Sequence, residues 1–234
     1  MTLVTRQLKK AARVILIGAP GVGKGTQTER LLTRFPELAS ISSGDLLREN
    51  VRRKTSLGLK AETAMQAGNL VPDSLILDLI SSEFKSKGWL AKSPGASISP
   101  TASFILDGFP RTSVQASSLD TLVPINFVVH LVTPPSIILS RIASRWVHEP
   151  SGRVYNTDFN APKVPGKDDI TGEPLTQRED DSLETWTQRL HKFEETSRAL
   201  LEHYDRKGCL WRAEGNTSDE ISPKLFAEIE NRFC

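Results

Sequence analysis

The sequence predicts an α/β fold in which helices cover both faces of a parallel β-sheet. Short apolar runs alternate along the chain with longer stretches that have the helical repeat. The apolar runs are nearly continuous, which is typical of strands buried on both faces of a sheet. The first run leads directly into a glycine-rich turn and a helix. With 234 residues, of which 38% are hydrophobic, the chain can bury a substantial core.

The elements are expected in the following order. Residues 14–17 are β-branched or long and apolar and form the first strand, and a helix over 27–32 follows the glycine-rich turn. Further apolar runs predict strands at 38–42, 104–106, 125–132 and near 209–213. Between them, the helical repeat predicts helices at 44–53, 57–67, 73–87, 135–145, 182–206 and 218–232.

The glycine-rich turn carries the first chemical motif, Gly18-Ala-Pro-Gly-Val-Gly-Lys-Gly-Thr26. Its glycines let the backbone curl so that N–H groups point at a phosphate chain resting on the N-terminus of the next helix. Lys24 then supplies a charge for the β- and γ-phosphates. Gly25 separates this lysine from Thr26, whereas the common motif has Ser or Thr there to hold Mg²⁺. The turn therefore predicts a P-loop NTPase-like sheet from another branch of phosphate-loop proteins.

Composition excludes several other classes of protein. A net charge of +2 argues against a dedicated nucleic-acid surface, and no apolar run approaches the ~20 residues of a membrane span. Cys209 and Cys234 match neither a zinc spacing nor a disulfide framework, which favours free thiols in a reducing compartment. The first 13 residues are basic, and no acid precedes Glu29. They are compatible with a mitochondrial address or with a solvated basic tail.

Two segments interrupt the alternation of strands and helices. Residues 147–176 are rich in Gly, Pro, Asn and Asp without a helical repeat, which indicates small strands and turns between two helices. An insertion of this length is often a lid over an active site. Residues 91–102 are small, polar and proline-bearing and indicate a surface connection to which no chemistry is assigned.

Ordered motifs along nearly the whole chain resemble the adenylate kinase family of nucleoside monophosphate kinases. They are 18–27, 41–48, 68–73, 106–112 with Gln115, Arg141 with Arg145, 150–155, and 178–181 with Arg189. The residues at 145–148 and 177–181 most resemble those of the mitochondrial GTP:AMP phosphotransferases of that family. The long segment 147–176 resembles the lid of the family's long-form members.

The resemblance implies a core domain of residues 1–41, 72–143 and 182–234, an AMP-binding insertion at 42–71 and a lid at 144–181. It implies direct, Mg²⁺-dependent transfer of the γ-phosphoryl group of GTP or ITP to AMP in the mitochondrial matrix, by a monomer without nucleic-acid or membrane partners. An ATP-preferring adenylate kinase is one alternative. A nucleotide-dependent switch or binding protein is another, although such a protein would have no use for AMP.

The resemblance also assigns the site residues. The residues expected to catalyse transfer are Lys24, Arg111, Arg145, Arg178 and Arg189. Those expected to bind the triphosphate donor are Gly21, Val22, Gly23, Lys24, Gly25, Thr26, Arg141, Arg145, Val154, Tyr155 and Thr217. Those expected to bind AMP are Ser43, Arg48, Asn69, Leu70, Val71, Gly108, Arg111, Gln115, Arg178 and Arg189. Arginine suits these positions because its planar guanidinium stays charged and grips phosphate with two N–H groups.

Residue spacing adds three expectations. Asp107 ends an apolar strand at the carboxyl edge of the sheet, where a carboxylate could hold Mg²⁺ through water. Arg141 and Arg145 lie four positions apart, which predicts one helical face for both. The same spacing places Gln115 on a helical face with Arg111, where its amide could pair with adenine.

The lid contains His148, Ser151, Asp168 and Thr171 at positions where many long-form relatives have four zinc-binding cysteines. Hydroxyl groups are poor zinc ligands, so this set predicts a hydrogen-bonded cluster without zinc. Trp146 and Trp186 are expected at helix positions, where large aromatic side chains usually pack in a core. The remaining histidines, at 130, 191 and 203, lie in strand or helix patterns and are expected to be structural.

Overall fold

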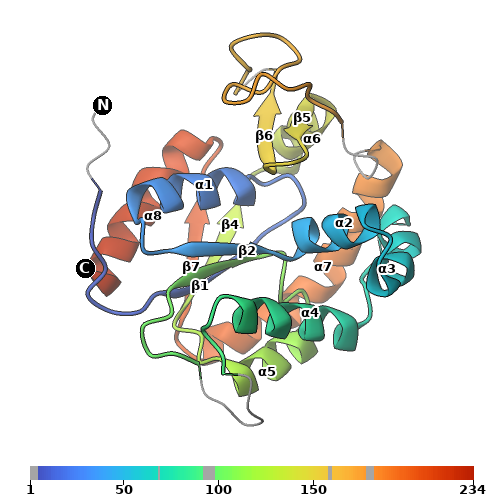
Figure 1. Cartoon of the computed structure of the whole chain (residues 1–234). Helices are drawn as coiled ribbons and strands as arrows, with labels where there is room; N and C mark the ends of the chain where they lie inside the picture. Colours follow the sequence, from blue (N-terminus) through green and yellow to red (C-terminus); the bar gives the residue numbers. More distant parts are fainter. Residues whose placement is uncertain (1–4, 68, 92–97, 158–159, 178–181) are drawn as a thin grey trace.

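A five-stranded parallel sheet forms the centre of the molecule, with the strand order β2-β3-β1-β4-β7 (Figure 1). The computed structural model describes residues 5–67, 69–91, 98–157, 160–177 and 182–234. The strands are β1 (Arg13–Ile17), β2 (Ala39–Ser42), β3 (Phe104–Asp107), β4 (Phe127–Val132) and β7 (Leu210–Glu214). All five expected strands are confirmed, with ends within two residues of the prediction. The strand order places β1 and its glycine-rich turn in the middle of the sheet.

Eight helices lie in the described part of the chain. They are α1 (Lys24–Arg34), α2 (Ser43–Arg52), α3 (Ser56–Gln66), α4 (Asp73–Ser86), α5 (Ser113–Leu122), α6 (Pro135–Ala143), α7 (Leu183–Arg206) and α8 (Ser218–Phe233). Apart from α5, each corresponds to an expected helix. Among the described residues, no helix is both long and apolar enough to cross a membrane.

The central strands β1, β3 and β4 send their side chains alternately into two hydrophobic cores. From β1, Val14 and Leu16 pack with residues of α1, α6 and α8. Ile15 and Ile17 pack on the other face with residues of α2, α3, α4, α5 and α7. Because both faces are covered, the central strands β1, β3 and β4 are mostly apolar, as the sequence predicted. The outer strands β2 and β7 contain polar or charged residues.

The helix α5 was not among the expected helices, although Gln115 was expected on one. Its sequence is weakly patterned, and its start is set by Thr112, whose hydroxyl accepts the backbone N–H of Gln115 at 3.1 Å. Arg111 precedes this cap, so the expectation that Arg111 and Gln115 share a helical face was wrong.

The helix α6 ends two residues before the expected Arg145. Arg145 and Trp146 instead belong to β5 (Arg145–His148), which pairs antiparallel with β6 (Arg153–Asn156). The expectation that Arg141 and Arg145 share one helical face was therefore wrong, as was the helical placement of Trp146. Pairing with β6 determines the local structure here, because Trp146 lies opposite Tyr155 in the ladder.

The β5–β6 hairpin stands above the carboxyl edge of the central sheet and forms the small strands expected within 147–176 (Figure 1). Isolated bridges join Val147 to Thr176 and Lys167 to Pro174. Half of the expected surface connection 91–102 lies outside the described part of the chain, namely residues 92–97. Leu90 and Ile98, on either side of those residues, form an isolated bridge.

Candidate functional site

The glycine-rich turn after β1 adopts the conformation that a phosphate loop requires. Gly21 and Gly23 have φ values of 86° and 103°, which residues with a side chain rarely adopt. A Cβ on Gly18 would lie 2.9 Å from the carbonyl oxygen of Leu131. Gly23 caps α1 without a side-chain hydrogen bond, so the first N–H groups of α1 are available to an anion.

Lys24 begins α1 and turns back over this loop. Its Nζ donates to the carbonyl oxygens of Gly18 at 2.8 Å and Ala19 at 3.1 Å. Burial lowers the pKa of Lys24 to about 8, and the nearby Asp107 raises it. The guanidinium groups of Arg111, Arg189 and Arg145 lower it further. These residues come from four separate segments, so the fold concentrates positive charge around one carboxylate and one lysine.

A cleft of about 1150 Å³ opens at this edge of the sheet. It is lined by Gly21, Gly23, Lys24, Gly25, Thr26, Arg48, Leu70, Asp107, Gly108, Arg111, Arg141, Arg145, Val154, Tyr155, Arg189 and Thr217, among others. A smaller cavity of about 50 Å³ adjoins it and is lined in part by Ser43, Asn69, Val71 and Gln115 together with Arg48, Arg111 and Arg189. The fold thus brings the two expected ligand sets to neighbouring cavities that share three arginines.

Among the described residues, Val22 is the one expected site residue that lines neither cavity. Val22 is buried, and its backbone oxygen accepts a hydrogen bond from Arg141 Nη1 at 3.0 Å. Arg178 is outside the described residues.

Arg141 of α6 bridges two loops of the cleft. Besides Val22 of the phosphate loop, it donates from Nη2 to the backbone oxygen of Asn216 at 2.7 Å. Thr217 follows and caps α8, because its hydroxyl accepts the backbone N–H of Glu220 at 3.2 Å. Burial lowers the pKa of Arg141, which is consistent with its position in the wall of the cleft.

The smaller cavity is organised around Arg111. Its Nε donates to Gly108 O at 2.7 Å, and its backbone N–H donates to Gln115 Oε1 at 2.7 Å. Gln115 Nε2 donates in turn to Asp73 Oδ1 at 2.7 Å. The Gln115 amide keeps one N–H and one lone pair for a ligand, since each amide atom can make two hydrogen bonds. Ser43 Oγ is buried with no protein partner among the described residues and faces the same region.

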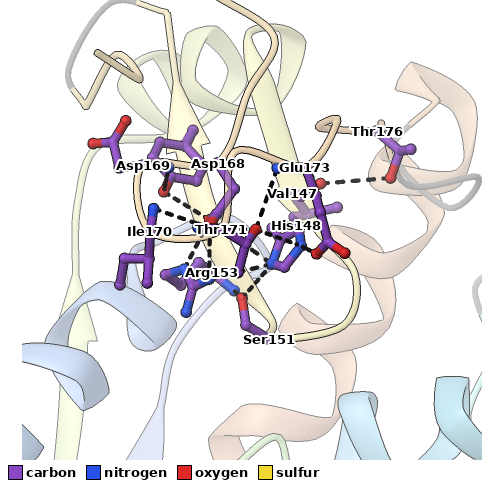
Figure 2. Close-up of polar contacts among 11 residues, drawn as sticks. Val147, His148, Ser151, Arg153, Asp168, Asp169, Ile170, Thr171, Glu173 and Thr176 are labelled. Carbon is purple, nitrogen blue, oxygen red and sulfur yellow. Dashed lines mark hydrogen bonds and ion pairs between the residues drawn. The ribbon is translucent and has the colours of Figure 1, made fainter. Parts of the chain in front are cut away.

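The four lid residues form the expected hydrogen-bonded cluster (Figure 2). His148 and Asp168 are both 2% exposed. His148 Nδ1 lies 2.7 Å from Ser151 Oγ, and Thr171 donates to Asp168 Oδ2 from its backbone N at 2.8 Å and its Oγ1 at 3.0 Å. Among the described residues, no three His, Cys, Asp or Glu side chains are grouped so that they could hold a metal ion.

Three further side chains complete this cluster. Arg153 grips Asp168 with Nε at 2.8 Å and Nη2 at 2.6 Å, and Tyr155 OH donates to Asp168 at 2.9 Å. Glu173 Oε2 lies 2.6 Å from His148 Nε2. The Arg153 hydrogen bonds, with those of Thr171 and Tyr155, hold the pKa of Asp168 well below its ordinary value. Asp168 therefore remains charged and joins both halves of the lid.

The residues expected to be structural lie away from the centre of the cleft. Trp186 is 6% exposed and donates from Nε1 to Pro20 O at 3.0 Å, which ties α7 to the phosphate loop. His203 pairs with Asp120 at 2.7 Å, His191 pairs with Glu195 at 3.2 Å, and neither they nor His130 line the two cavities.

Sequence reasoning missed several polar partners of the site: Asp73, Arg153, Glu173 and the buried pair Gln27 and Ser222. Asp73, Arg153 and Gln27 stand in the motifs 68–73, 150–155 and 18–27, but the motifs assigned them no role. Nothing local marks Glu173, which meets His148 only through the folded chain.

Comparison with known proteins agrees with this geometry. The family model described as "Adenylate kinase" matches residues 16–209. The chain belongs to the adenylate kinase family. A mitochondrial GTP:AMP phosphotransferase of Saccharomyces cerevisiae is 48% identical over 231 residues, covering 97% of this chain and 95% of that protein. A second, from S. cerevisiae strain S288c, is 49% identical over 92% of the chain and 94% of its own length.

A third adenylate kinase family relative extends the comparison beyond yeast. The mitochondrial GTP:AMP phosphotransferase of Drosophila melanogaster is 40% identical over 224 residues, covering 96% of this chain and 98% of its own. The family membership confirms the resemblance and the α/β fold expected from the sequence. The match from residue 16 to residue 209 includes the phosphate loop, the smaller cavity and residues 144–181, whereas the wall of the cleft formed by Thr217 and α8 lies beyond it.

Proposed function

We propose that this adenylate kinase family member transfers the γ-phosphoryl group of GTP or ITP to AMP, giving GDP and ADP. One observation above all supports this proposal. Asp107, Arg111, Arg145 and Arg189 all lie close enough to Lys24 to affect its pKa, in a cleft that adjoins a second cavity. Phosphoryl transfer needs two anionic ligands brought into line and their charge neutralised, with little covalent chemistry from the protein. No side chain is assigned as a nucleophile, so transfer is direct.

The donor would occupy the larger cleft. Its phosphates would rest on the turn from Gly21 to Thr26, where the backbone N–H groups of α1 are available. Lys24 would contact the β- and γ-phosphates. The base of the donor would lie against Arg141 and near Val154, Tyr155 and Thr217. Binding an anion here relieves the mutual repulsion of the cations, which is the physical reason for expecting tight binding.

AMP would bind with its base at the smaller cavity and its phosphate in the adjoining part of the larger cleft. Arg48 and Arg111 would bind its phosphate, and the remaining N–H and lone pair of Gln115 would pair with adenine. Ser43, Gly108 and residues 69–71 would complete the walls. Arg145, Arg178 and Arg189 would converge on the transferring group between the two ligands. The geometry that supports this is the sharing of Arg111 and Arg189 by both cavities.

Mg²⁺ is the cofactor generally used with nucleotides in this family, and Asp107 is the proposed residue for it. Asp107 lies at the carboxyl end of β3, lines the cleft and is close enough to Lys24 to raise its pKa. A carboxylate suits Mg²⁺, which keeps several waters and needs only one or two protein oxygens. When bound with the nucleotide, Mg²⁺ would neutralise charge on the phosphate oxygens.

Two segments are proposed to close on the ligands, the AMP-binding insertion 42–71 and the lid 144–181, with the rest of the chain as the core. The lid hairpin contributes Arg145, Val154 and Tyr155 to the cleft, so its closure would complete the donor site and exclude water. Exclusion of water is needed because a loose site would hydrolyse the donor instead of transferring its phosphate.

The donor preference and location rest on the relatives. All three are named mitochondrial GTP:AMP phosphotransferases and align over more than nine tenths of the chain. We extend the GTP preference and the mitochondrial location to this protein and place it in the matrix. The monomeric state expected from the sequence is kept as part of the proposal.

Initial rates of ADP formation from AMP and Mg²⁺, with GTP, ITP or ATP at matched concentrations, test the proposal. Faster turnover with GTP than with ATP is expected. An ATP preference would overturn the donor assignment, and nucleotide binding without ADP formation would overturn the kinase assignment. Fractionated mitochondria with protease protection would test the matrix location.

A further inference from the structure

The side chain of Gln27 is buried next to the phosphate loop. Its amide contacts α8 and lines neither of the two cavities. Gln27 lies on the first turn of α1, three residues after Lys24, and is 1% exposed. Its Nε2 donates to the backbone oxygen of Ser218 at 3.3 Å, and its Oε1 lies 2.9 Å from Ser222 Oγ. Both partners belong to the first turns of α8, more than 190 positions away in the sequence.

Ser222 makes this contact part of a larger network. It is 3% exposed, and its hydroxyl lies within donating distance of both Gln27 Oε1 and Ser218 O, the latter at 2.7 Å. Arg30 Nη1 donates to the same Oγ at 3.0 Å, and Arg30 Nη2 pairs with Asp219 at 2.7 Å. Gln27 and Ser222 are the buried part of this network, whereas the Arg30–Asp219 pair is exposed. The buried part defines a single geometry, because breaking its hydrogen bond leaves a buried group unpaired.

The loop 216–218 lies between this network and Arg141. On one side, Arg141 joins Asn216 O to Val22 O of the phosphate loop. On the other, Gln27 joins Ser218 O to the helix that begins the phosphate site. The backbone N–H of Asn216 is also held by Glu220 Oε2 at 2.8 Å. The loop is therefore fixed to the phosphate loop at both ends.

We infer that Gln27, acting through Ser222 and Ser218, is a positioning residue for the base of the donor nucleotide. The inference rests on the proposed function, in which the donor spans the phosphate loop and the loop 216–218. A ligand that contacts both segments binds with full strength only when their separation matches its length. Gln27 fixes that separation without contacting the phosphates or the base.

The test compares a whole donor with a ligand that has no base. The variants are Gln27→Met and Ser222→Ala, which remove the hydrogen bonds with little change in volume. Ser103→Ala is the matched control, because Ser103 is also buried and hydrogen-bonded. Ser103 directly precedes β3 and therefore lies at the amino ends of the strands, whereas the phosphate loop lies at their carboxyl ends. Calorimetry would measure the Kd of Mg²⁺–GTP and of inorganic tripolyphosphate, and initial rates would give KM for GTP and AMP.

Gln27→Met and Ser222→Ala are expected to raise the Kd and KM for GTP roughly tenfold, on the scale of one or two lost buried hydrogen bonds. Tripolyphosphate affinity, KM for AMP and the Ser103→Ala protein should stay within about twofold of wild type. Equal weakening of GTP and tripolyphosphate would overturn the inference, because Gln27 would then act on the phosphate loop. Unchanged GTP binding in both variants would also overturn it.

The binding measurements do not require turnover. If the wild-type protein binds GTP but forms no ADP, the proposed reaction is refuted. The effect of Gln27→Met on GTP binding can still be measured in that case. If Gln27→Met does not fold, as judged by its thermal transition, Ser222→Ala alone decides the outcome.

Discussion

The backbone N–H of Arg111 donates a 2.7 Å hydrogen bond to Oε1 of Gln115. The same amide donates to Asp73, so the segment preceding α5 is tied to the N-terminus of α4. This chain of contacts holds Arg111 at the boundary of the two cavities, where its guanidinium also influences the pKa of Lys24. The position of Arg111 therefore depends on α5 even though Arg111 lies outside that helix.

Arg111→Ala is expected to lower turnover by about 1000-fold, on the scale known for arginines that stabilise phosphoryl transfer. The fold should persist, because Arg111 lies in a loop at the cleft rather than in either hydrophobic core. Steady-state rates and a thermal transition would be measured beside Arg198→Ala, which removes an arginine exposed on α7. Wild-type turnover in Arg111→Ala would eliminate its proposed role.

Binding of the donor is expected to weaken above pH 8. Lys24 in the free protein has a pKa of about 8, and the triphosphate requires its charged form. As the pH rises from 8 toward the ordinary lysine value of 10.5, binding must take up a proton, and affinity falls by up to tenfold per pH unit. Below pH 8 this dependence disappears.

Calorimetry of GTP binding between about pH 7 and 9, in buffers of different ionisation enthalpy, measures this proton uptake. Lys24→Arg is the control, since its guanidinium stays charged throughout and any remaining pH dependence belongs to the ligand. Identical proton uptake in the two proteins would show that Lys24 is not the titrating group.

Asp168→Asn is expected to loosen the lid selectively. The change removes the charge that Arg153 grips and that holds Thr171. Hydrogen exchange followed by mass spectrometry should show faster exchange at 145–156 and 166–176, with the central sheet unchanged. Exchange in these two segments at the wild-type rate would contradict this. In the wild type, the stabilisation from Asp168 is complete above pH 3.8 and is lost as pH falls through its depressed native pKa.

The purified protein is expected to contain no stoichiometric zinc. Two of the four lid positions are hydroxyl side chains, and His148 and Asp168 are already engaged by Ser151, Glu173 and Arg153. Elemental analysis after dialysis against zinc-containing buffer checks this. One zinc per chain would overturn the description of the cluster as a hydrogen-bonded one.

The central sheet and the position of the phosphate loop could be predicted because they depend on local patterns. The mostly apolar central strands indicate a sheet covered on both faces, and Gly21 and Gly23 mark a backbone that needs positive φ. The lid cluster of His148, Ser151, Asp168 and Thr171 was predicted because these residues stand where long-form relatives have four cysteines. Their partner Glu173 was not, since nothing local distinguishes it from a solvated acid.

The errors concerned residues at element boundaries. Four-residue spacing suggested a helix through Arg145, but pairing of the adjacent Trp146 with Tyr155 places it in a hairpin. For Arg111, the cap at Thr112 starts the helix two residues later. In both cases tertiary or capping contacts outweighed a periodicity that only two residues supported. The contacts of Gln27 with α8 join distant segments and have no sequence pattern.

The composition of the lid cluster has a consequence for how the protein withstands oxidative chemistry. A lid held by four cysteines loses its ligands when thiolates are oxidised, and its structure then depends on repair. Here imidazole, hydroxyl, carboxylate and guanidinium groups hold the same segments together, and both cysteines of the chain lie outside the lid. The cluster therefore offers no thiolate to peroxide and no bound metal to a chelating agent, and its hydrogen bonds persist under conditions that would dismantle a zinc–cysteine site.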